Sequence, residues 1–256
     1  MKNQHLSLNL NQHQLLFDRP WNHILLSILQ GVIGQVWVDN MNDPRSALAI
    51  VGHSCQFAFL GGQVDQGLLE HTKQGEVIVV PCSPQWSDYF QTFDPQLIRG
   101  FTRYAMQVPQ SFDRSQLISY TRSLPEPYQL RLIDETLYYQ CLSQAWSRDL
   151  VGNYPTYGDF ASHGKGYLVM DDQEIVSGAG SFLPIEEGIE IEVDTHPDYR
   201  GLGLATVAVA QLILSCIDSN WYPSWDAHTE ISRDFAKKFG YSVEFDYRSY
   251  EWLKSE

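Results

Sequence analysis

Short apolar runs separated by turn residues fill much of the first half of the chain, and this pattern predicts strands. β-Branched and aromatic residues make up the runs, whereas Asn, Pro and Gly separate them. The strands predicted in this way are residues 34–38, 47–51, 57–60 and 77–80. An apolar spacing of three to four residues predicts a helix over residues 11–31, broken at Asp18-Arg19-Pro20, and shorter helices over residues 85–93 and 115–122.

The second half of the chain mixes the two periodicities more evenly. Its predicted helices are residues 134–147, 204–217 and 231–239, and its predicted strands are residues 167–170, 174–179, 189–194, 221–225 and 241–252, the last one strand or a pair. The first two of these strands are close enough to form a hairpin. The helix at 204–217 is apolar nearly all round, so we expect it to be packed between layers. This order of elements indicates an α/β protein of the layered α+β kind.

The segment Leu124-Pro125-Glu126-Pro127 is the best candidate for a boundary within the chain. Two prolines two positions apart interrupt a helix and bias the residue between them toward an extended conformation. We therefore expect two domains, an N-terminal α/β domain of residues 1–124 and a second domain of residues 125–256. The first of these contains no motif to which chemistry can be attached.

Composition and charge narrow the class of protein. The 256 residues are 43% hydrophobic and 13% aromatic, so a substantial core is available and global disorder is excluded. The formal net charge of −14 repels phosphate backbones and anionic lipid, so we expect no nucleic-acid and no membrane partner. Without an apolar leader or a long apolar span, the chain is expected to be cytoplasmic. The four scattered cysteines are expected to be reduced structural thiols.

The most informative segment runs from a predicted strand, through His196-Pro197-Asp198, into Gly201 and Gly203 and then directly into a helix. The backbone N–H groups at a helix start have no intrahelical acceptors and lie at the positive end of the helix dipole. Glycines at alternate positions let a phosphate approach the backbone closely. We therefore expect an anion site, although an ordinary strand-to-helix turn remains an alternative.

Three phosphate-binding patterns compete for this loop. No Gly-Lys-Ser/Thr occurs, so the Walker loop is excluded. The dinucleotide fingerprint needs a small residue at the position of Thr206, and it needs glycines just after the strand. Here six residues, 195–200, separate the strand from Gly201. Both departures disfavour an NAD-dependent dehydrogenase. The remaining pattern is Arg-x-x-Gly-x-Ala, formed by Arg200 to Ala205. It resembles the coenzyme A pyrophosphate loop of the GNAT superfamily of N-acetyltransferases.

A second segment, Thr229 to Tyr241, resembles the short helix that follows the next strand in that superfamily. Its Lys-x-Gly-aromatic ending matches, with Thr229 as a helix N-cap and Gly240 as a C-cap. Two positions depart from the pattern, because Thr229 replaces the usual Asn and Ala236 replaces a Tyr that can protonate the departing thiolate. Within the superfamily, the amino-acid sequences of both segments are most similar to those of the zwittermicin A resistance-like acetyltransferases. The resemblance covers residues 128–256, and the first half is hypothesised to be a degenerate copy of the same fold.

Acetyl transfer to an amine needs an acceptor for the amine proton, because a free alkylamine has a pKa near about 10. On a strand, Glu190, Glu192 and Asp194 share one face, while Ile189, Ile191 and Val193 alternate with them toward the core. Repulsion among three carboxylates can raise the pKa of the most buried one toward that of a useful base. We expect Glu190 first, and Glu192 second, to be the catalytic base. A solvated polar strand face is the alternative.

The resemblance also implies how a cofactor would bind. It implies a mixed, mostly antiparallel sheet flanked by helices, with acetyl-coenzyme A as cosubstrate and no metal. Backbone groups of Val193 and Thr195 would hold the thioester. The phosphates would lie on the residues of the loop and helix start, with Ser232 as a further contact or merely a polar helix residue. The phosphate-binding residues would be Arg200, Gly201, Leu202, Gly203, Leu204, Ala205 and Thr206. Candidates for the thiolate acid are Tyr199, Tyr241 and Tyr247.

The function expected from the sequence is acetyl-coenzyme A-dependent N-acetyl transfer to a small-molecule amine by a monomer or homodimer. A non-catalytic module that binds coenzyme A or a cationic metabolite is the alternative, motivated by Ala236. Residues 171–198 carry nine Asp and Glu and no Lys or Arg, which favours a cationic amine. The first half of the chain is expected to cover the substrate side.

Overall fold

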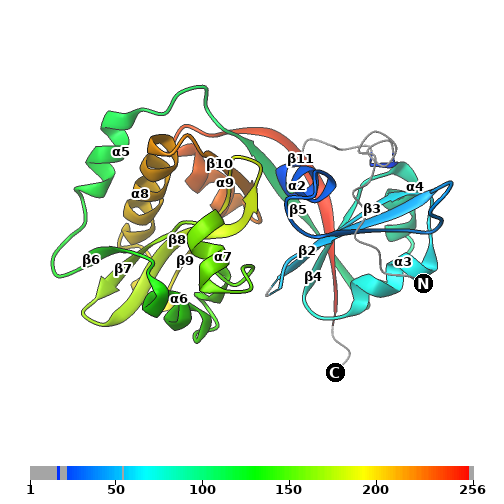
Figure 1. Ribbon diagram of the computed structural model, residues 1–256, viewed down its shortest axis with the longest axis horizontal. Coiled ribbons are helices and arrows are strands. Elements are labelled where there is room, and N and C mark those ends of the chain that lie inside the picture. The colour runs from blue at the N-terminus through cyan, green and yellow to red at the C-terminus, as the bar shows by residue number, and fades with distance from the viewer. Residues whose placement is uncertain (1–15, 18–21, 54, 254–256) are drawn as a thin grey trace. The chain divides into compact units, whose positions relative to one another are not determined.

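The computed structural model describes residues 16–17, 22–53 and 55–253 (Figure 1). The chain forms two compact units, one of residues 1–103 and 246–256 and the other of residues 104–245, called unit 1 and unit 2 below. These limits differ from the expected boundary at residues 124 and 125. Two long strands, β5 (Ile98–Gln107) and β11 (Ser242–Trp252), pass from one unit into the other. The Pro125–Pro127 segment instead lies within unit 2, ahead of strand β6 (Gln129–Leu132).

Unit 1 contains a mixed sheet in the order β1-β2-β3-β4-β11. Neighbouring strands are antiparallel except β3 and β4, which are parallel. The four new strands are β1 (Gln35–Val38), β2 (Ser46–Val51), β3 (Gln56–Gly62) and β4 (Val77–Pro81), and all four were predicted. The helices are α2 (His23–Leu29), α3 (Gln66–Glu70) and α4 (Pro84–Phe90). Trp86 and Phe90 of α4 are buried against the sheet residues of this core. The first part of the predicted helix 11–31 lies outside the described residues.

Unit 2 contains a sheet in the order β5-β10-β9-β8-β7-β6, antiparallel except for the pair β9 and β10. The other strands are β7 (Tyr167–Asp171), β8 (Glu174–Ile185), β9 (Gly188–Thr195) and β10 (Tyr222–Ala227). β7 and β8 form the predicted hairpin, with Asp172 in the left-handed conformation at its turn. The helices are α5 (Arg114–Thr121), α6 (Glu135–Leu142), α7 (Tyr157–His163), α8 (Leu204–Asp218) and α9 (Glu230–Lys237). The expected mixed, mostly antiparallel sheet flanked by helices is therefore confirmed.

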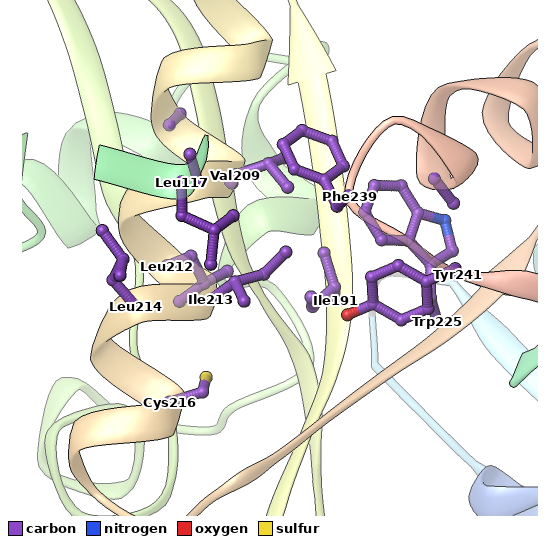
Figure 2. Packing of buried hydrophobic residues seen from close by; sticks show 14 of the residues in the cluster. Leu117, Ile191, Val209, Leu212, Ile213, Leu214, Cys216, Trp225, Phe239 and Tyr241 are labelled. Atoms are coloured by element: carbon purple, nitrogen blue, oxygen red, sulfur yellow. The ribbon is translucent and has the colours of Figure 1, made fainter. Parts of the chain in front are cut away.

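Two separate cores hold helices against the sheet of unit 2. One contains eight residues of the nearly all-apolar helix α8 together with Ile189 and Ile191 of β9, and Figure 2 shows Val209 and Ile213 on the side of α8 that faces Ile191. Trp225, Phe239 and Tyr241 complete this core. The other core packs α6 and α7 against β7 and β8 through residues such as Tyr138 and Phe160. Helix α8 is thus fixed beside β9, and its first turn follows the end of that strand.

The differences from the predicted elements have local causes. β5 was not predicted, because Arg99, Gly100 and Arg103 interrupt any apolar alternation along it. Helix α7 was missed because it buries only Phe160. The predicted helix 134–147 ends at Leu142, whereas β8 extends beyond the predicted residue 179 to Ile185.

All four cysteines are free thiols, three of them buried and Cys55 half-buried. Burial raises the pKa of the Cys141 and Cys216 thiols to about 12. Both are therefore neutral core side chains at physiological pH. No helix in the described part of the chain is long and apolar enough to cross a membrane.

Candidate active site

Strands β9 and β10 are paired at their beginnings and then part. Their parallel register joins Gly188 to Tyr222 and continues only as far as Glu190 and Ser224. From Trp225 onward β10 pairs with β5 on its other side, while β9 continues to Thr195 paired with β8. Residues 191–195 therefore have, among the described strands, a partner along one edge only. The register of β8 shifts beside this point, between Ser181 and Leu183, as at a bulge that bends a strand.

Glu190 lies where the two strands part. Its side chain is buried, with 3% of the residue exposed, and Oε1 accepts a hydrogen bond of 2.5 Å from the backbone N–H of Asp226 on β10. A buried carboxylate requires such a partner, because desolvation without compensation is costly. The solvated strand face that was the alternative interpretation does not apply to Glu190. It describes Glu192 and Asp194 better, since both are half-buried.

Beyond Glu190, the backbone N–H groups of β9 are met by carboxylates of the same strand. The N–H of Val193 donates to Glu192 Oε1 at 3.2 Å, and the N–H of Thr195 donates to Asp194 Oδ1 at 2.7 Å. Side chains thus satisfy donors that a neighbouring strand would take in a continuous sheet. These are the two backbone positions that were expected to hold a thioester.

The predicted anion loop has the conformation that its glycines allow. Gly201 and Gly203 have φ of 80° and 79°, which is the left-handed region. No atom lies within 4 Å of the place that a Cβ would occupy at either glycine. The backbone of the loop is therefore open to a ligand.

Helix α8 begins at this loop without a side-chain cap. Its N-cap residue is Gly203, and its first turn contains no acidic residue. Each of the other α-helices in the described ranges has an N-cap side chain that accepts a backbone N–H; these caps are Asn22, Asp65, Ser83, Asp113, Asp134, Thr156 and Thr229. No side chain therefore caps the first turn of α8 and no carboxylate there would repel an anion, while the N–H of Thr206 donates to the carbonyl oxygen of Gly203 at 3.0 Å. The anion site itself stays a prediction.

Arg200 is turned back toward the end of β9. Its Nε donates to the carbonyl oxygen of Thr195 at 3.2 Å, and its Nη2 lies 3.9 Å from Asp194 Oδ1. The side chain is 64% exposed. The expected contact between Arg200 and phosphate stays a prediction, and it requires the guanidinium to change partners.

The second predicted segment forms helix α9 next to β10. Thr229 caps the helix by accepting the N–H of Ser232, and Ser232 Oγ accepts the indole N–H of Trp225 at 3.2 Å. Ala236, at the position of the superfamily Tyr, is fully buried in the core. Helix α9 therefore carries no side chain there that could reach a ligand.

The three tyrosines considered as thiolate acids differ in their surroundings. Tyr199 donates to Asp171 Oδ2 at 3.1 Å, and this hydrogen bond is the main reason why the pKa of its phenol is raised. Tyr241 donates to the carbonyl oxygen of Pro223 at 2.8 Å, and burial raises its pKa well above the usual value. Tyr247 belongs to unit 1, where Asn22 donates to its hydroxyl. Tyr199 and Tyr241 are thus already committed to protein acceptors.

One element of the site was missed from the sequence, the 3₁₀ helix η3 (Arg148–Leu150). Gly178 and Gly180 of β8 pair with Asp194 and Glu192, and a Cβ at Gly180 would lie far inside van der Waals contact with the carbonyl oxygen of Leu150. The two glycines therefore let η3 lie flat on the sheet beside the acidic residues of β9. The pattern Gly178-Ala179-Gly180 within a strand was the available signal for this close approach.

The negative charge of Asp149 in η3 acts on Asp194 of β9. The pKa of Asp194 is raised, mainly by burial and in addition by the negative charge of Asp149, whereas the N–H of Thr195 and the charge of Arg200 oppose the shift. No group of three or more His, Cys, Asp or Glu that could hold a metal ion occurs among the described residues.

The comparisons with known proteins identify the family of the chain. A family model described as GNAT acetyltransferase matches residues 14–250. A crystal structure of a GCN5-related N-acetyltransferase-like protein from Streptococcus suis 89/1591 is 42% identical, with 95% of this chain and 98% of that chain covered and a TM-score of 0.91. The uncharacterized N-acetyltransferase YdfB of Bacillus subtilis strain 168 is 26% identical over 250 residues, which cover 91% of each chain.

A GCN5-related N-acetyltransferase from Kribbella flavida shares the fold, with a TM-score of 0.58 at 10% identity over 94% of this chain and 96% of that one. Because the family model spans most of the chain, the protein belongs to the GNAT acetyltransferase family and is an acyltransferase. The match includes residues 14–103 and 246–250 of unit 1, so most of the first half of the chain is part of the family's own architecture.

Proposed function

We propose that the protein transfers the acetyl group of acetyl-coenzyme A to the amine of a small molecule. The observation that carries this proposal is the order of three features along β9 and the loop that follows it. Glu190 lies where β9 leaves β10, the N–H groups of Val193 and Thr195 follow, and the uncapped start of α8 comes next. A base, backbone donors for a carbonyl and an anion site thus occur in the order that a long thioester cofactor requires.

The loop fits the phosphates of coenzyme A by an argument that does not depend on the family. Gly201 and Gly203 leave the space over the backbone free, and the helix start supplies N–H groups at the positive end of the α8 dipole. The residues that would hold the phosphates are Arg200, Gly201, Leu202, Gly203, Leu204, Ala205 and Thr206. Ser232 on α9 would contact the cofactor arm.

Glu190 would accept the proton of the acceptor amine. Its Oε1 is held by the N–H of Asp226, so the carboxylate has a fixed orientation at the point where β9 and β10 cease to pair. Acetyl-coenzyme A, when bound, would supply the acetyl group and a thiol leaving group. The N–H groups of Val193 and Thr195 would stabilise negative charge on the carbonyl oxygen, after Glu192 and Asp194 release them. Glu192 is the second candidate for the base.

The proposed acceptor is a cationic amine of low molecular weight. The acidic stretch of residues 171–198 raises the local concentration of cations, while the base removes one proton before attack. All residues that carry the proposal belong to unit 2. We therefore assign the chemistry of acetyl transfer to unit 2.

Thermal unfolding in the presence of acetyl-coenzyme A tests the cofactor. At about 100 times its dissociation constant the ligand should add about 2.7 kcal/mol to the free energy of unfolding, which is a rise of a few degrees in Tm. NAD at the same concentration should give no rise. Absence of a shift with millimolar acetyl-coenzyme A would overturn the assignment.

A further inference from the structure

Asp194 occupies a particular place between the two halves of the proposed cofactor site. Its Oδ1 atom accepts the N–H of Thr195 at 2.7 Å and lies 3.9 Å from Nη2 of Arg200. Thr195 is proposed to face the thioester end of the cofactor, and Arg200 the phosphate end. One carboxylate oxygen therefore engages a group from each end.

Arg200 is also attached to the strand directly. Its Nε donates to the carbonyl oxygen of Thr195, the same residue whose N–H is bound by Asp194. The guanidinium is thus held over the end of β9 by a carbonyl and a carboxylate, one residue before the open loop at Gly201. An incoming phosphate has to compete with both acceptors for this cation.

We infer that Asp194 is a positioning residue that restrains both ends of the cofactor site in the free enzyme, because it competes with the cofactor for Arg200 and for the N–H of Thr195. A phosphate has to displace Asp194 from the guanidinium, and a thioester carbonyl has to displace it from the backbone N–H. This inference rests on the proposed function, and it assigns Asp194 a role that neither the loop motif nor the catalytic base provides.

The inference makes a prediction about the sign of an effect. A carboxylate that competes with the ligand for two binding groups lowers affinity, so its removal should tighten binding. A residue that only supports the fold, or that contacts the ligand favourably, would give weaker binding when removed. The two interpretations are therefore distinguished by direction as well as by size.

The charge of Asp194 must be separated from its contacts. Coenzyme A is an anion, so loss of any nearby carboxylate favours binding to some extent. Asp198 is a matched control, because it lies in the same strand-to-loop connection, carries the same charge and has an 85% exposed side chain that contacts His196 and not Arg200. Asp198→Ala reports the effect of charge alone.

The experiment is calorimetric titration of acetyl-coenzyme A into wild type, Asp194→Ala, Asp194→Asn and Asp198→Ala at one ionic strength, with Tm as the check on folding. Asp194→Ala should bind about 3- to 10-fold more tightly than wild type, the scale of one partly exposed ion pair and a released N–H. Asp194→Asn should tighten less, because its amide oxygen can still accept from Thr195, and Asp198→Ala should change affinity less than about 2-fold. In an Arg200→Gln background, Asp194→Ala should gain less than it does alone, since the shared partner is gone.

Equal or weaker binding by Asp194→Ala and Asp194→Asn, relative to Asp198→Ala, would overturn the inference while wild-type binding left the proposed function intact. Failure of the wild type to bind acetyl-coenzyme A would overturn both. If Asp194→Ala does not fold, Asp194→Asn alone decides between tightening and no tightening.

Discussion

Glu190 on β9 and the backbone of Asp226 on β10 are joined by a 2.5 Å hydrogen bond at the point where the two strands cease to pair. The carboxylate thus spans the opening instead of pointing along one strand. Because the pair of residues is 36 positions apart in the chain, the contact exists only when β9 and β10 are parallel neighbours. It fixes the proposed base next to the backbone donors proposed for the thioester, which is the arrangement that acetyl transfer needs.

Glu190→Gln should separate catalysis from binding. The amide keeps an oxygen that can accept from Asp226, so Tm should fall little, but it cannot take a proton. We expect kcat to fall about 100- to 1,000-fold with coenzyme A affinity within about 2-fold of wild type. Glu186→Gln, on the exposed turn before β9, is the control and should retain wild-type kcat. A larger loss in Glu192→Gln than in Glu190→Gln would move the base to Glu192.

Gly203→Ala should damage coenzyme A binding more than folding. A Cβ there meets no protein atom within 4 Å, so the cost to stability is the left-handed backbone alone, about 1 kcal/mol. The same Cβ points into the space proposed for phosphate, and we expect coenzyme A to bind at least about 10-fold more weakly. Titration calorimetry of coenzyme A into Gly203→Ala and into the control Gly75→Ala measures the difference in affinity.

Gly75→Ala provides the matched control, because Gly75 also has positive φ and open space around its Cβ position but lies in unit 1. It should lose a similar amount of stability and no affinity for coenzyme A. Equal affinity of Gly203→Ala and Gly75→Ala would remove the loop from the proposed binding site.

Gly180→Ala should destabilise the protein through η3. The added methyl group would collide with the carbonyl oxygen of Leu150, a backbone atom that cannot rotate away, so we expect a loss of about 3 kcal/mol in the free energy of unfolding. Gly158→Ala in helix α7 has 3.6 Å to its nearest neighbour, and it should be neutral or slightly stabilising. Chemical denaturation of both variants measures the contrast, and similar midpoints would mean that η3 does not lie on β8 in solution.

Stability should fall in alkali because of buried thiols. Burial raises the pKa of Cys141 and Cys216 to about 12 in the folded state, whereas an unfolded thiol has a pKa near about 8.5. Since the folded pKa is the higher one, this contribution is complete below about pH 8.5 and is lost as pH rises from there toward 12. Each thiol should cost about 1.4 kcal/mol per pH unit within that window. The Tm measured between pH 8 and 11 should fall less steeply for Cys216→Ala than for wild type. An equal slope would contradict the raised pKa of the buried Cys216 thiol.

The local pattern of apolar residues predicted much of the fold from the sequence. The apolar runs at β2, β3 and β4 were found because nearly every residue in them is buried, and α8 was found because nine of its 15 residues are buried apolar side chains. β5 was not found, since Arg99, Gly100 and Arg103 hide its alternation. The division of the chain could not be placed from Pro125 and Pro127, because it depends on how far β5 and β11 extend.

The candidate site divides in the same way. The loop was predictable, because glycines such as Gly201 and Gly203 are the residues that adopt positive φ, and α8 follows them immediately. The orientation of Glu190 was not, because it depends on the register with β10, nor was the return of Arg200 to Thr195. Non-local pairing decides these contacts, and no short segment of sequence contains it.

Release of free thiol from acetyl-coenzyme A on a panel of small amines tests the central claim most directly. The proposal predicts that at least one cationic amine gives thiol release matched by its own acetylated product, and that Glu190→Gln abolishes most of that release. Binding of coenzyme A without thiol release on any amine of the panel, or release that Glu190→Gln and Glu192→Gln both leave unchanged, would contradict it.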